Sequence, residues 1–385
     1  HDNYKIEFVG ARKESYSKDS RNPSIEMGSF MDDMLRRDFT INTLAISLNT
    51  KTFGNLIDTF DGINDLEKGV ITTPTEPDKT FIDDPLRMLR AVRFACQLGF
   101  QIDKKTTKSI IKNSDRINIL SSERIADEIN KILMTKTPSN GFKNLEKLKI
   151  LDYIIPELID LKGVEEVEGQ THKDNFYHTL EVVDNISSKT DNLWLRWAAL
   201  LHDIGKSPTK KFNKKLGWTF HGHEHVGSKM VKQIFTRLKL PLNDTMKYVQ
   251  KIVMMSSRPI IIAEDIVTDS AVRRLIYDAG NSIDDLLTLC EADITTKNKR
   301  KFEKYHNNFK IVREKIKTVE EKDNIRNFQP PVTGEIIMKH FNIGPCKEIG
   351  IIKDEIKNAI LDGEIKNNYK SAFNLMKIKG KSLGL

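Results

Sequence analysis

Three arginines stand three residues apart in the stretch DDPLRMLRAVRF. Arg87, Arg90 and Arg93 would share one face of a helix that begins with Asp84 as its capping residue and a proline at its first position, where a missing N–H costs nothing. Like charges at this spacing repel one another. The pattern therefore predicts an anionic group lying across this helix face.

A second group of polar residues lies in RRDFTIN, residues 36–42. These residues surround an apolar run that we predict as a β-strand. Arg36 and Arg37 can grip a triphosphate, because guanidinium groups bind phosphate oxygens through paired hydrogen bonds. Asp38 and Asn42 can hold ribose hydroxyls or brace the two arginines. Two cations, a carboxylate and an amide do not suit a plain core strand, so the stretch indicates a nucleotide site.

Asp84 and Arg87 can read the base of such a nucleotide. Cytosine and adenine each place an amino donor beside a ring-nitrogen acceptor, so a carboxylate and a guanidinium at (i, i+3) can meet both bases. Uracil and guanine present the reversed polarity. The alternative is that Asp84 only caps the helix and Arg87 pairs with a surface acid.

Histidines and aspartates form a third group. His178 lies in HTLEVVDN, His202 and Asp203 lie in LHDIGK, and Asp293 lies in CEADITTKN. The apolar helix predicted at LWLRWAALL is followed directly by a His-Asp pair, and burial of these two polar side chains in a core would be unfavourable without partners. Neutral imidazoles with carboxylates suit a transition metal or Mg²⁺ that activates water, so these residues predict a metal site.

Composition narrows the classes of protein that fit. The 385 residues are 38% hydrophobic and 30% charged, and they contain no run of membrane-spanning length and no signal peptide. Three widely spaced cysteines form no disulfide framework and suit a reducing compartment. These features predict a soluble cytoplasmic protein without a membrane partner, and the net charge of +8 permits a polyanionic partner.

The basic residues are unevenly distributed. The stretch TKNKRKFEKYHNNFKIVREKIK, residues 296–317, contains nine Lys or Arg and two Glu. Its apolar residues follow a helical spacing: Phe302, Tyr305, Phe309, Val312 and Ile316. Two interpretations stay open. The stretch is either a surface helix with lysines in water or a face that follows phosphates.

The pattern of elements predicts a mainly α fold with a small α+β N-terminal part. The runs YKIEFVGA, FTINTLAISLN and FGNLIDTF are β-like, whereas SYSKDSRNPS is predicted as a loop. Helices are predicted at DPLRMLRAVRFACQLGF, DKKTTKSIIKN and SSERIADEINKILM. We expect four regions: an incomplete head at 1–64, a helical neck at 65–150, a helical body at 151–320 and a tail at 321–385.

Together, RRDFTIN, DDPLRMLRAVRF, SSERIADEINKIL and FGNLIDTFDGINDLEKGVI resemble motifs of the class II tRNA nucleotidyltransferases, the CCA-adding enzymes, and of the related bacterial poly(A) polymerases. The resemblance implies a nucleotidyltransferase head and an amino-acid template for CTP and ATP. It assigns nucleotide binding to Arg36, Arg37, Asp38, Asn42, Asp84, Arg87, Arg90 and Arg93. Glu123 and Arg124 match a further neck motif, with a role in supporting the template helix.

One feature of that family is absent from this chain. The family transfers nucleotides with two metal ions held by paired carboxylates after a Gly-Gly turn, and no such Gly-Gly or Asp-x-Asp segment occurs at the start of this sequence. Glu7 matches a family acid beside the missing pair and is a candidate catalytic residue, although an ordinary outward-facing strand glutamate fits equally. We expect a truncated or separated first segment.

The His and Asp group resembles the HD metal-dependent phosphohydrolase domain. The resemblance makes His178, His202, Asp203 and Asp293 its signature metal ligands, and His223 in HEHVG matches the more variable middle histidine. It implies phosphodiesterase or phosphatase activity, including opening of 2′,3′-cyclic phosphates. Such a domain can also survive as a scaffold without a metal. The tail resembles the family's C-terminal region, which implies RNA binding.

The predicted function is addition of C, C and A to the 3′ end of tRNA from CTP and ATP, with Mg²⁺ as cofactor and a divalent transition metal possible at the HD site. Poly(A) addition is one alternative. Another is an HD phosphohydrolase whose head binds nucleotide or RNA without catalysis. The sequence leaves open CC-only or A-only addition, the metal at the HD site and the oligomeric state.

Overall fold

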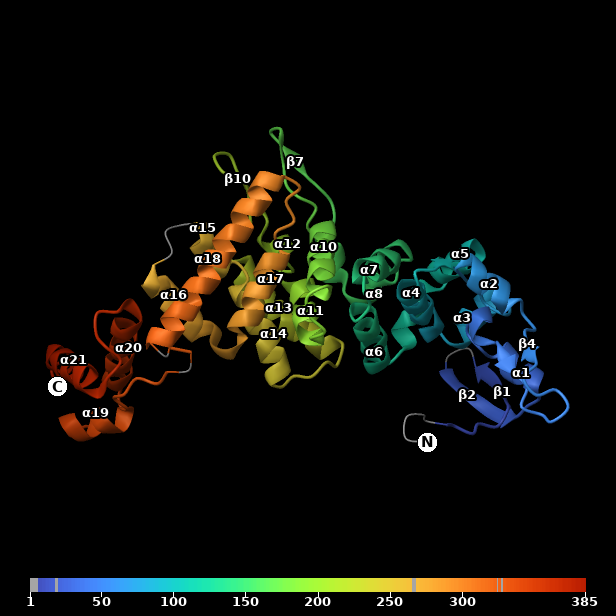
Figure 1. The fold of residues 1–385 in the computed structure, drawn as a ribbon, viewed down its shortest axis with the longest axis horizontal. Helices are drawn as coiled ribbons and strands as arrows, with labels where there is room; N and C mark the ends of the chain where they lie inside the picture. Colours follow the sequence, from blue (N-terminus) through green and yellow to red (C-terminus); the bar gives the residue numbers. More distant parts are fainter. Residues whose placement is uncertain (1–5, 18–19, 265–267, 324, 327) are drawn as a thin grey trace. The chain divides into compact units, whose positions relative to one another are not determined.

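The computed structural model describes residues 6–17, 20–264, 268–323, 325–326 and 328–385. The chain forms two compact units, His1–Gln250 and Lys251–Leu385. Helices dominate both units, and the described strands form short two-stranded sheets (Figure 1). The predicted fold class, mainly α with a small α+β N-terminal part, is confirmed.

The first sheet lies where the sequence predicts a loop. Strands β1 (Arg12–Ser17) and β2 (Ser20–Met27) pair antiparallel, so the loop prediction for SYSKDSRNPS is wrong. The strand predicted at YKIEFVGA is also wrong over its described part, because residues 6–11 have no regular structure, and residues 1–5 lie outside the described residues. Turn-forming residue types indicate a loop locally, but cross-strand pairing is a non-local interaction that overrides this preference.

The other predicted strands are only partly present. FTINTLAISLN forms a 3₁₀ turn, Thr40–Asn42, followed by β3 (Ala45–Ile46), which pairs antiparallel with β4 (Leu56–Ile57). The strand predicted at the RRDFTIN run is therefore wrong. A further sheet joins β5 (Val70–Ile71) to β6 (Gln101–Ile102) in parallel.

The helices of the first unit carry most of its structure. They are α1 (Phe30–Leu35), α2 (Gly62–Lys68), α3 (Pro77–Asp83), α4 (Leu86–Leu98), α5 (Lys104–Lys112), α6 (Ser122–Leu133), α7 (Pro138–Lys147), α8 (Leu151–Ile154), α9 (Pro156–Ile159), α10 (Asn175–Ser187), α11 (Leu193–Leu201), α12 (Lys206–Thr209) and α13 (His223–Arg237), with a 3₁₀ turn at Ser114–Ile119. The three helices predicted for the neck are confirmed as α4, α5 and α6, and the helix predicted at LWLRWAALL is confirmed as α11.

Helix α4 carries the three arginines predicted to bind a nucleotide. Its Met88, Leu89 and Val92 are fully buried, and the helix packs against α6 and α7. It ends at Gly99, whose φ of 71° lies in the left-handed region that favours glycine. Burial of its apolar face fixes the rotation of α4, and this rotation decides where each of its arginines points.

Helices α10 and α11 pack against each other; α10 carries His178, and α11 leads directly into His202 and Asp203. Asp174 caps α10, and Asn192 caps α11 through its side-chain oxygen. Trp197 of α11 and Phe176 of α10 are fully buried. Two antiparallel hairpins lie in the same unit: β7 (Glu166–Val167) with β8 (Gln170–Thr171), and β9 (Lys211–Asn213) with β10 (Gly217–Thr219).

Helix α14 (Asp244–Met255) includes the boundary between the units. The second unit contains α15 (Arg258–Glu264), α16 (Asp269–Ala279), α17 (Ile283–Ala292), α18 (Lys299–Asp323), α19 (Gly334–Phe341), α20 (Lys347–Asp362), α21 (Tyr369–Ser382) and a 3₁₀ turn at Gly280–Ser282. The four predicted domain ranges stay a prediction, because the two units are a coarser division. None of the described helices has the length and apolar composition needed to cross a membrane.

Candidate functional site

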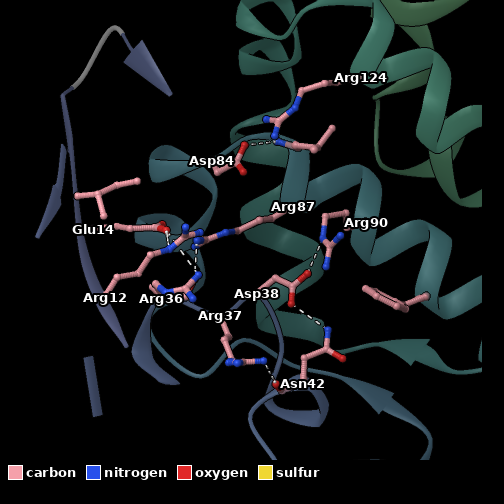
Figure 2. Close-up of a pocket in the computed structure, with 13 residues that line it drawn as sticks. Arg12, Glu14, Arg36, Arg37, Asp38, Asn42, Asp84, Arg87, Arg90 and Arg124 are labelled. Atoms are coloured by element: carbon pink, nitrogen blue, oxygen red, sulfur yellow. Dashed lines mark hydrogen bonds and ion pairs between the residues drawn. The ribbon is translucent and has the colours of Figure 1, made fainter. Parts of the chain in front are cut away.

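A cavity of about 730 Å³ in the first unit contains most of the predicted nucleotide-binding side chains. Seven of the eight predicted residues line it, and they are Arg36, Arg37, Asp38, Asn42, Asp84, Arg87 and Arg90. They come from the segment after α1 and from the start of α4, and Figure 2 shows the two groups around one pocket. The volume lies within the range of pockets that hold small ligands.

Helix α1 sets the position of the first two arginines. Its N-terminus is a capping box, in which Asp32 N–H donates to Ser29 Oγ at 3.2 Å and Ser29 N–H donates to Asp32 Oδ2 at 2.8 Å. The helix ends at Leu35, so Arg36 and Arg37 follow directly. A helix with a fixed start and end delivers both side chains to the cavity from one short element.

Asp33 holds the two arginines. Arg36 donates to Asp33 Oδ1 at 2.8 Å, and Arg37 donates to Oδ2 at 3.2 Å. Burial works to raise the pKa of Asp33, but the hydrogen bonds and charges of the two arginines outweigh burial and lower the pKa. The carboxylate therefore stays ionised and orients both guanidinium groups. The sequence analysis missed Asp33, although its (i, i+3) and (i, i+4) spacing from the arginines was a usable signal.

Asp38 joins the two motifs. Its Oδ1 accepts from Asn42 Nδ2 at 2.9 Å, and its Oδ2 accepts from Arg90 Nε at 2.6 Å (Figure 2). The side chain of Asp38 is 8% exposed. Arg37 donates to the backbone carbonyl of Asn42 at 3.0 Å. The arginine that Asp38 contacts is thus Arg90 of α4, and its predicted role toward ribose stays a prediction.

Asp84 and Arg87 both line the cavity, as their spacing predicts. Asp84 Oδ1 accepts from the backbone N–H of Leu86 at 3.1 Å, so Asp84 also performs the capping role of the alternative interpretation. Arg87 Nη2 donates to the backbone carbonyl of Arg36 at 2.6 Å. A guanidinium has five N–H donors, so this single bond is compatible with further contacts to a ligand.

Arg93 does not line the cavity, and its assignment to nucleotide binding stays a prediction. Its Nε donates to Glu128 Oε2 of α6 at 2.6 Å, and both side chains are buried. Its guanidinium carbon also lies 4.0 Å from the centroid of the Phe94 ring. The sequence predicts an anionic group across the three arginines. For two of them this group is a protein carboxylate: Asp38 at Arg90 and Glu128 at Arg93.

Three charged residues of the cavity were not assigned to it from the sequence. Arg12 and Glu14 of β1 line it, and so does Arg124 of α6, for which only a supporting role was predicted. Arg12 Nε lies 2.8 Å from Glu14 Oε1, and Arg36 Nη1 lies 3.4 Å from the same oxygen. With these, six arginines and three carboxylates line the cavity. The excess of positive charge suits a polyphosphate.

Two acidic residues singled out from the sequence lie away from the cavity lining. Glu7 is exposed and lies in a segment without regular structure. The alternative interpretation, an ordinary outward-facing glutamate of a strand, therefore does not hold. The catalytic role of Glu7 stays a prediction. Glu123 pairs with Lys239 at 2.8 Å, and this interaction lowers the pKa of the glutamate. The motif that contains Glu123 therefore reaches the cavity through Arg124 alone.

Four of the predicted metal ligands come together in the first unit. Asp203 follows α11 directly after His202, and its Oδ2 lies 3.4 Å from His202 Nε2 and 3.7 Å from His178 Nε2. Its Oδ1 lies 3.7 Å from Nε2 of His223, the first residue of α13. His178, His202 and Asp203 are buried. Lys206 also reaches Asp203 Oδ2, at 2.7 Å.

The position of the hydrogen on each imidazole decides whether these side chains can bind a cation, because a metal ligand needs a ring nitrogen with a lone pair. Nδ1 of His202 is 2.8 Å from the Ala199 carbonyl, and Nδ1 of His223 is 2.9 Å from the Phe220 carbonyl. Because a carbonyl only accepts, both Nδ1 atoms carry a hydrogen, and in the neutral imidazoles both Nε2 atoms then present a lone pair on the side of Asp203. These three side chains fit a divalent cation.

His178 is oriented differently. The Lys173 ammonium lies 2.7 Å from its Nδ1, so the ring hydrogen is on Nε2. Binding of a cation by Nε2 would require this ring to change its tautomer and its hydrogen bond with Lys173. Asp293, the remaining predicted ligand, immediately follows α17 in the second unit. Its role as a ligand stays a prediction.

Three family models match the chain. Residues 1–72 match the poly A polymerase head domain, residues 99–161 match the probable RNA and SrmB-binding site of polymerase A, and residues 175–298 match the HD domain. The cavity residues lie in or beside the first two matches, and the histidine cluster lies in the third. The order of the matches is the order predicted from the motifs.

Two curated relatives extend this likeness. The chain is 32% identical over 270 residues to the A-adding tRNA nucleotidyltransferase of Deinococcus radiodurans, across 68% of this chain and 59% of that protein. It is 35% identical over 217 residues to the multifunctional CCA protein of Shewanella frigidimarina, across 54% of this chain and 50% of that protein. The chain therefore spans about half the length of these relatives.

Solved structures show the same fold. The Bacillus stearothermophilus CCA-adding enzyme in complex with CTP has a TM-score of 0.66 at 20% identity, covering 96% of this chain and 79% of that one. The Thermotoga maritima CCA-adding enzyme complexed with tRNA has a TM-score of 0.52 at 20% identity, covering 92% and 74%.

Fold and site together define a helical protein with a nucleotidyltransferase-type head and an HD domain. The chain belongs to the family of the tRNA nucleotidyltransferases and bacterial poly(A) polymerases.

Proposed function

We propose that this chain is part of a tRNA nucleotidyltransferase that adds C, C and A to the 3′ end of tRNA from CTP and ATP, in the cytoplasm. The observation that carries the proposal is the single cavity lined by seven residues of the two nucleotide motifs. The name of the Deinococcus relative supports tRNA as the acceptor, and both names weigh against poly(A) addition. Three free cysteines support a reducing compartment.

Each part of the cavity has a task in nucleotide binding. Arg36 and Arg37, oriented by Asp33, bind the triphosphate through charge-assisted hydrogen bonds. Asp84 accepts the amino group of cytosine or adenine, and Arg87 donates to the ring nitrogen. Divalent cations, with Mg²⁺ as the proposed ion, would stabilise the charge on the reacting phosphate.

Selectivity in nucleotide binding tests this proposal. Calorimetric titration of the chain with each of the four nucleoside triphosphates should give binding of CTP and ATP at least about tenfold tighter than that of UTP and GTP, because a bidentate edge contact discriminates by about 1–3 kcal/mol. Equal binding of all four, or of none, would contradict the proposal. Arg237→Ala, an exposed arginine outside the cavity, is the control.

The identity of the added nucleotide requires a second measurement. The Deinococcus relative is named for A addition and the Shewanella relative for CCA. Extension of tRNAs ending before the first C and before the final A, by the complete gene product, separates these activities. CCA addition requires both primers to be extended, and use of only the second primer would restrict the proposal to A addition.

A second candidate function is a metal-dependent phosphohydrolase activity at the HD cluster. It is favoured by the two imidazoles whose Nε2 lone pairs face the buried Asp203. A divalent cation held by His202, Asp203 and His223, and by His178 after a change of its tautomer, would lower the pKa of a bound water. Lys206, at 2.7 Å from Asp203, stands beside the cluster, where its charge can neutralise a phosphate oxygen.

Hydrolysis of bis(p-nitrophenyl) phosphate and 2′,3′-cAMP, assayed with Mg²⁺, Mn²⁺, Co²⁺ and Ni²⁺, tests the second candidate. Activity should disappear in Asp203→Ala and persist in Arg36→Ala, whose side chain lies in the other site. Metal binding is measured separately by calorimetry, and Asp203→Ala should weaken it. Absence of activity with every metal, or its survival in Asp203→Ala, would identify the HD domain as a scaffold.

A further inference from the structure

The first half of α18 and the residues before it carry a concentrated positive charge. Six basic side chains in this segment are exposed, and they form what we call the α18 patch: Lys297, Lys299, Arg300, Lys301, Lys304 and Lys310. Among the described residues, none of the six is in an ion pair (the described ion pairs of α18 begin at Arg313). Glu303 is the one acid between the first and last of them.

The second half of the same helix behaves differently. Arg313 Nε lies 2.5 Å from Glu291 Oε1, and Lys315 Nζ lies 2.8 Å from Asp269 Oδ1. These cations are neutralised within the second unit, and they help to hold α18 against its neighbours. The α18 patch therefore differs from the rest of the helix in lacking acidic partners.

The opposite face of α18 anchors the helix in the core. Phe309, Val312 and Ile316 are buried, and α18 packs against α15 and α16 of the same unit. Three of the five residues of the apolar stripe predicted from the sequence are thus in the core, whereas Phe302 is 42% exposed. Burial of these three residues fixes the helix in the second unit, and the basic side chains lie outside this buried face.

An exposed aromatic pair adjoins these charges. The Phe302 ring centroid lies 4.3 Å from that of His306, and His306 is half-buried. Aromatic faces beside lysines and arginines are suited to contacts with bases or sugars of RNA. The combination indicates more than a solvated helix surface.

We propose that the α18 patch binds the phosphate backbone of an RNA. Like charges at (i, i+3) and (i, i+4), such as Arg300 with Lys304, repel one another and are stabilised when an anion neutralises them. From Lys299 to Lys310 the helix rises roughly 16 Å at 1.5 Å per residue, so the patch can contact several consecutive phosphates. A membrane-binding helix would expose its apolar face, whereas Phe309, Val312 and Ile316 of α18 are buried in the core.

The identity of the RNA rests on the proposed function: we take it to be the tRNA that receives the nucleotides. The proposal adds a contact surface remote in sequence from the nucleotide cavity. Phosphate contacts fix register and supply affinity without reading sequence. The patch is therefore expected to bind RNA in a salt-dependent way and to have no effect on nucleotide selectivity.

The test compares three variants by fluorescence anisotropy with a labelled tRNA lacking its terminal CCA, at several salt concentrations. Lys299→Gln/Arg300→Gln/Lys304→Gln should bind about tenfold more weakly at low salt, and the slope of log Kd against log salt should fall by about two to three. Glu303→Gln should bind more tightly. Lys51→Gln/Lys229→Gln/Lys232→Gln, which removes three exposed charges of the first unit, should stay within about twofold of the wild type.

The outcomes separate this proposal from the proposed function. Wild-type protein that binds tRNA, with an unchanged slope in the α18 variant or an equal loss in the Lys51 control, would overturn the α18 patch alone. Wild-type protein that binds neither tRNA nor CTP would overturn the proposed function. Wild-type binding to phosphatidylserine vesicles or an acidic peptide in preference to tRNA would also overturn the patch proposal. CTP binding and circular dichroism should be unchanged in the α18 variant, which shows that it is folded.

Discussion

Arg90 donates its Nε–H to Asp38 across 2.6 Å and thereby joins two motifs separated by 52 residues of sequence. Asp38 also accepts from Asn42, so one carboxylate connects the segment after α1 to helix α4. Because the Asp38 side chain is largely buried, this ion pair is screened less by solvent than a surface pair. The nucleotide cavity is therefore assembled by packing of α4 against the preceding segment.

Arg36→Ala should weaken the binding of all four nucleoside triphosphates by a similar factor. Arg36 is proposed to bind the triphosphate, which all of them share, and a hydrogen bond to a charged group contributes about 1.5–3 kcal/mol. Calorimetric Kd values for CTP, ATP, UTP and GTP check this. Lys51→Gln removes an exposed charge outside the cavity and should leave them unchanged. A loss confined to one base would refute the assignment.

Arg87→Ala should instead reduce the preference for CTP and ATP over UTP and GTP. The reason is that Arg87 is proposed to donate to the ring nitrogen of the base, a contact with about 1–3 kcal/mol of discrimination. The ratio of Kd values is the measurement. Arg87 also donates to the Arg36 carbonyl, so some loss of affinity common to all four nucleotides is expected as well. An unchanged ratio would remove the template role.

Glu128→Ala should destabilise the protein by about 3–5 kcal/mol, because it leaves the buried Arg93 without its carboxylate partner. Chemical denaturation followed by circular dichroism measures this change. Arg93→Met/Glu128→Leu should regain most of the stability, since it removes both buried charges. Retained stability in Glu128→Ala, together with lost nucleotide binding in Arg93→Met/Glu128→Leu, would restore Arg93 to the nucleotide site.

Asp83→Asn should raise thermal stability at neutral pH. Burial raises the pKa of Asp83, although the charges of Arg87, Lys79 and Arg116 act in the opposite direction. An acid with a raised pKa in the folded state binds its proton more tightly there than in the unfolded state, so its ionisation destabilises the fold as pH rises. Melting temperatures at pH 4–8 check the sign.

The gain in Asp83→Asn should shrink as the pH falls toward the unfolded-state pKa of about 3.9, where the wild-type carboxyl is protonated in both states. Asp152→Asn, an exposed aspartate, should show no such trend. A gain that grows as the pH falls would show that the charge of Asp83 stabilises the fold.

Local patterns in the sequence were sufficient for the helices and for most of the nucleotide cavity. The cap at Asp84 and the apolar residues of α4 lie within one or two helical turns of each other, so their spacing alone predicts a helix and the face that it buries. The motif resemblance then assigned seven residues that do line one cavity. Helices depend on contacts between near neighbours, and such contacts can be predicted from a single segment.

Strands and partners required the tertiary structure. The hairpin β1–β2, which brings Arg12 and Glu14 to the cavity, lies in a segment that resembles a loop, because strand pairing is decided by a second strand. Arg93 has the same spacing as Arg87 and Arg90, yet it meets Glu128, 35 residues away. An ion pair depends on which helices pack together and at what rotation, and periodicity within one helix carries no information about this. The sequence by itself determined that α4 presents arginines, and only the packing of α6 decided which of them is available to a ligand.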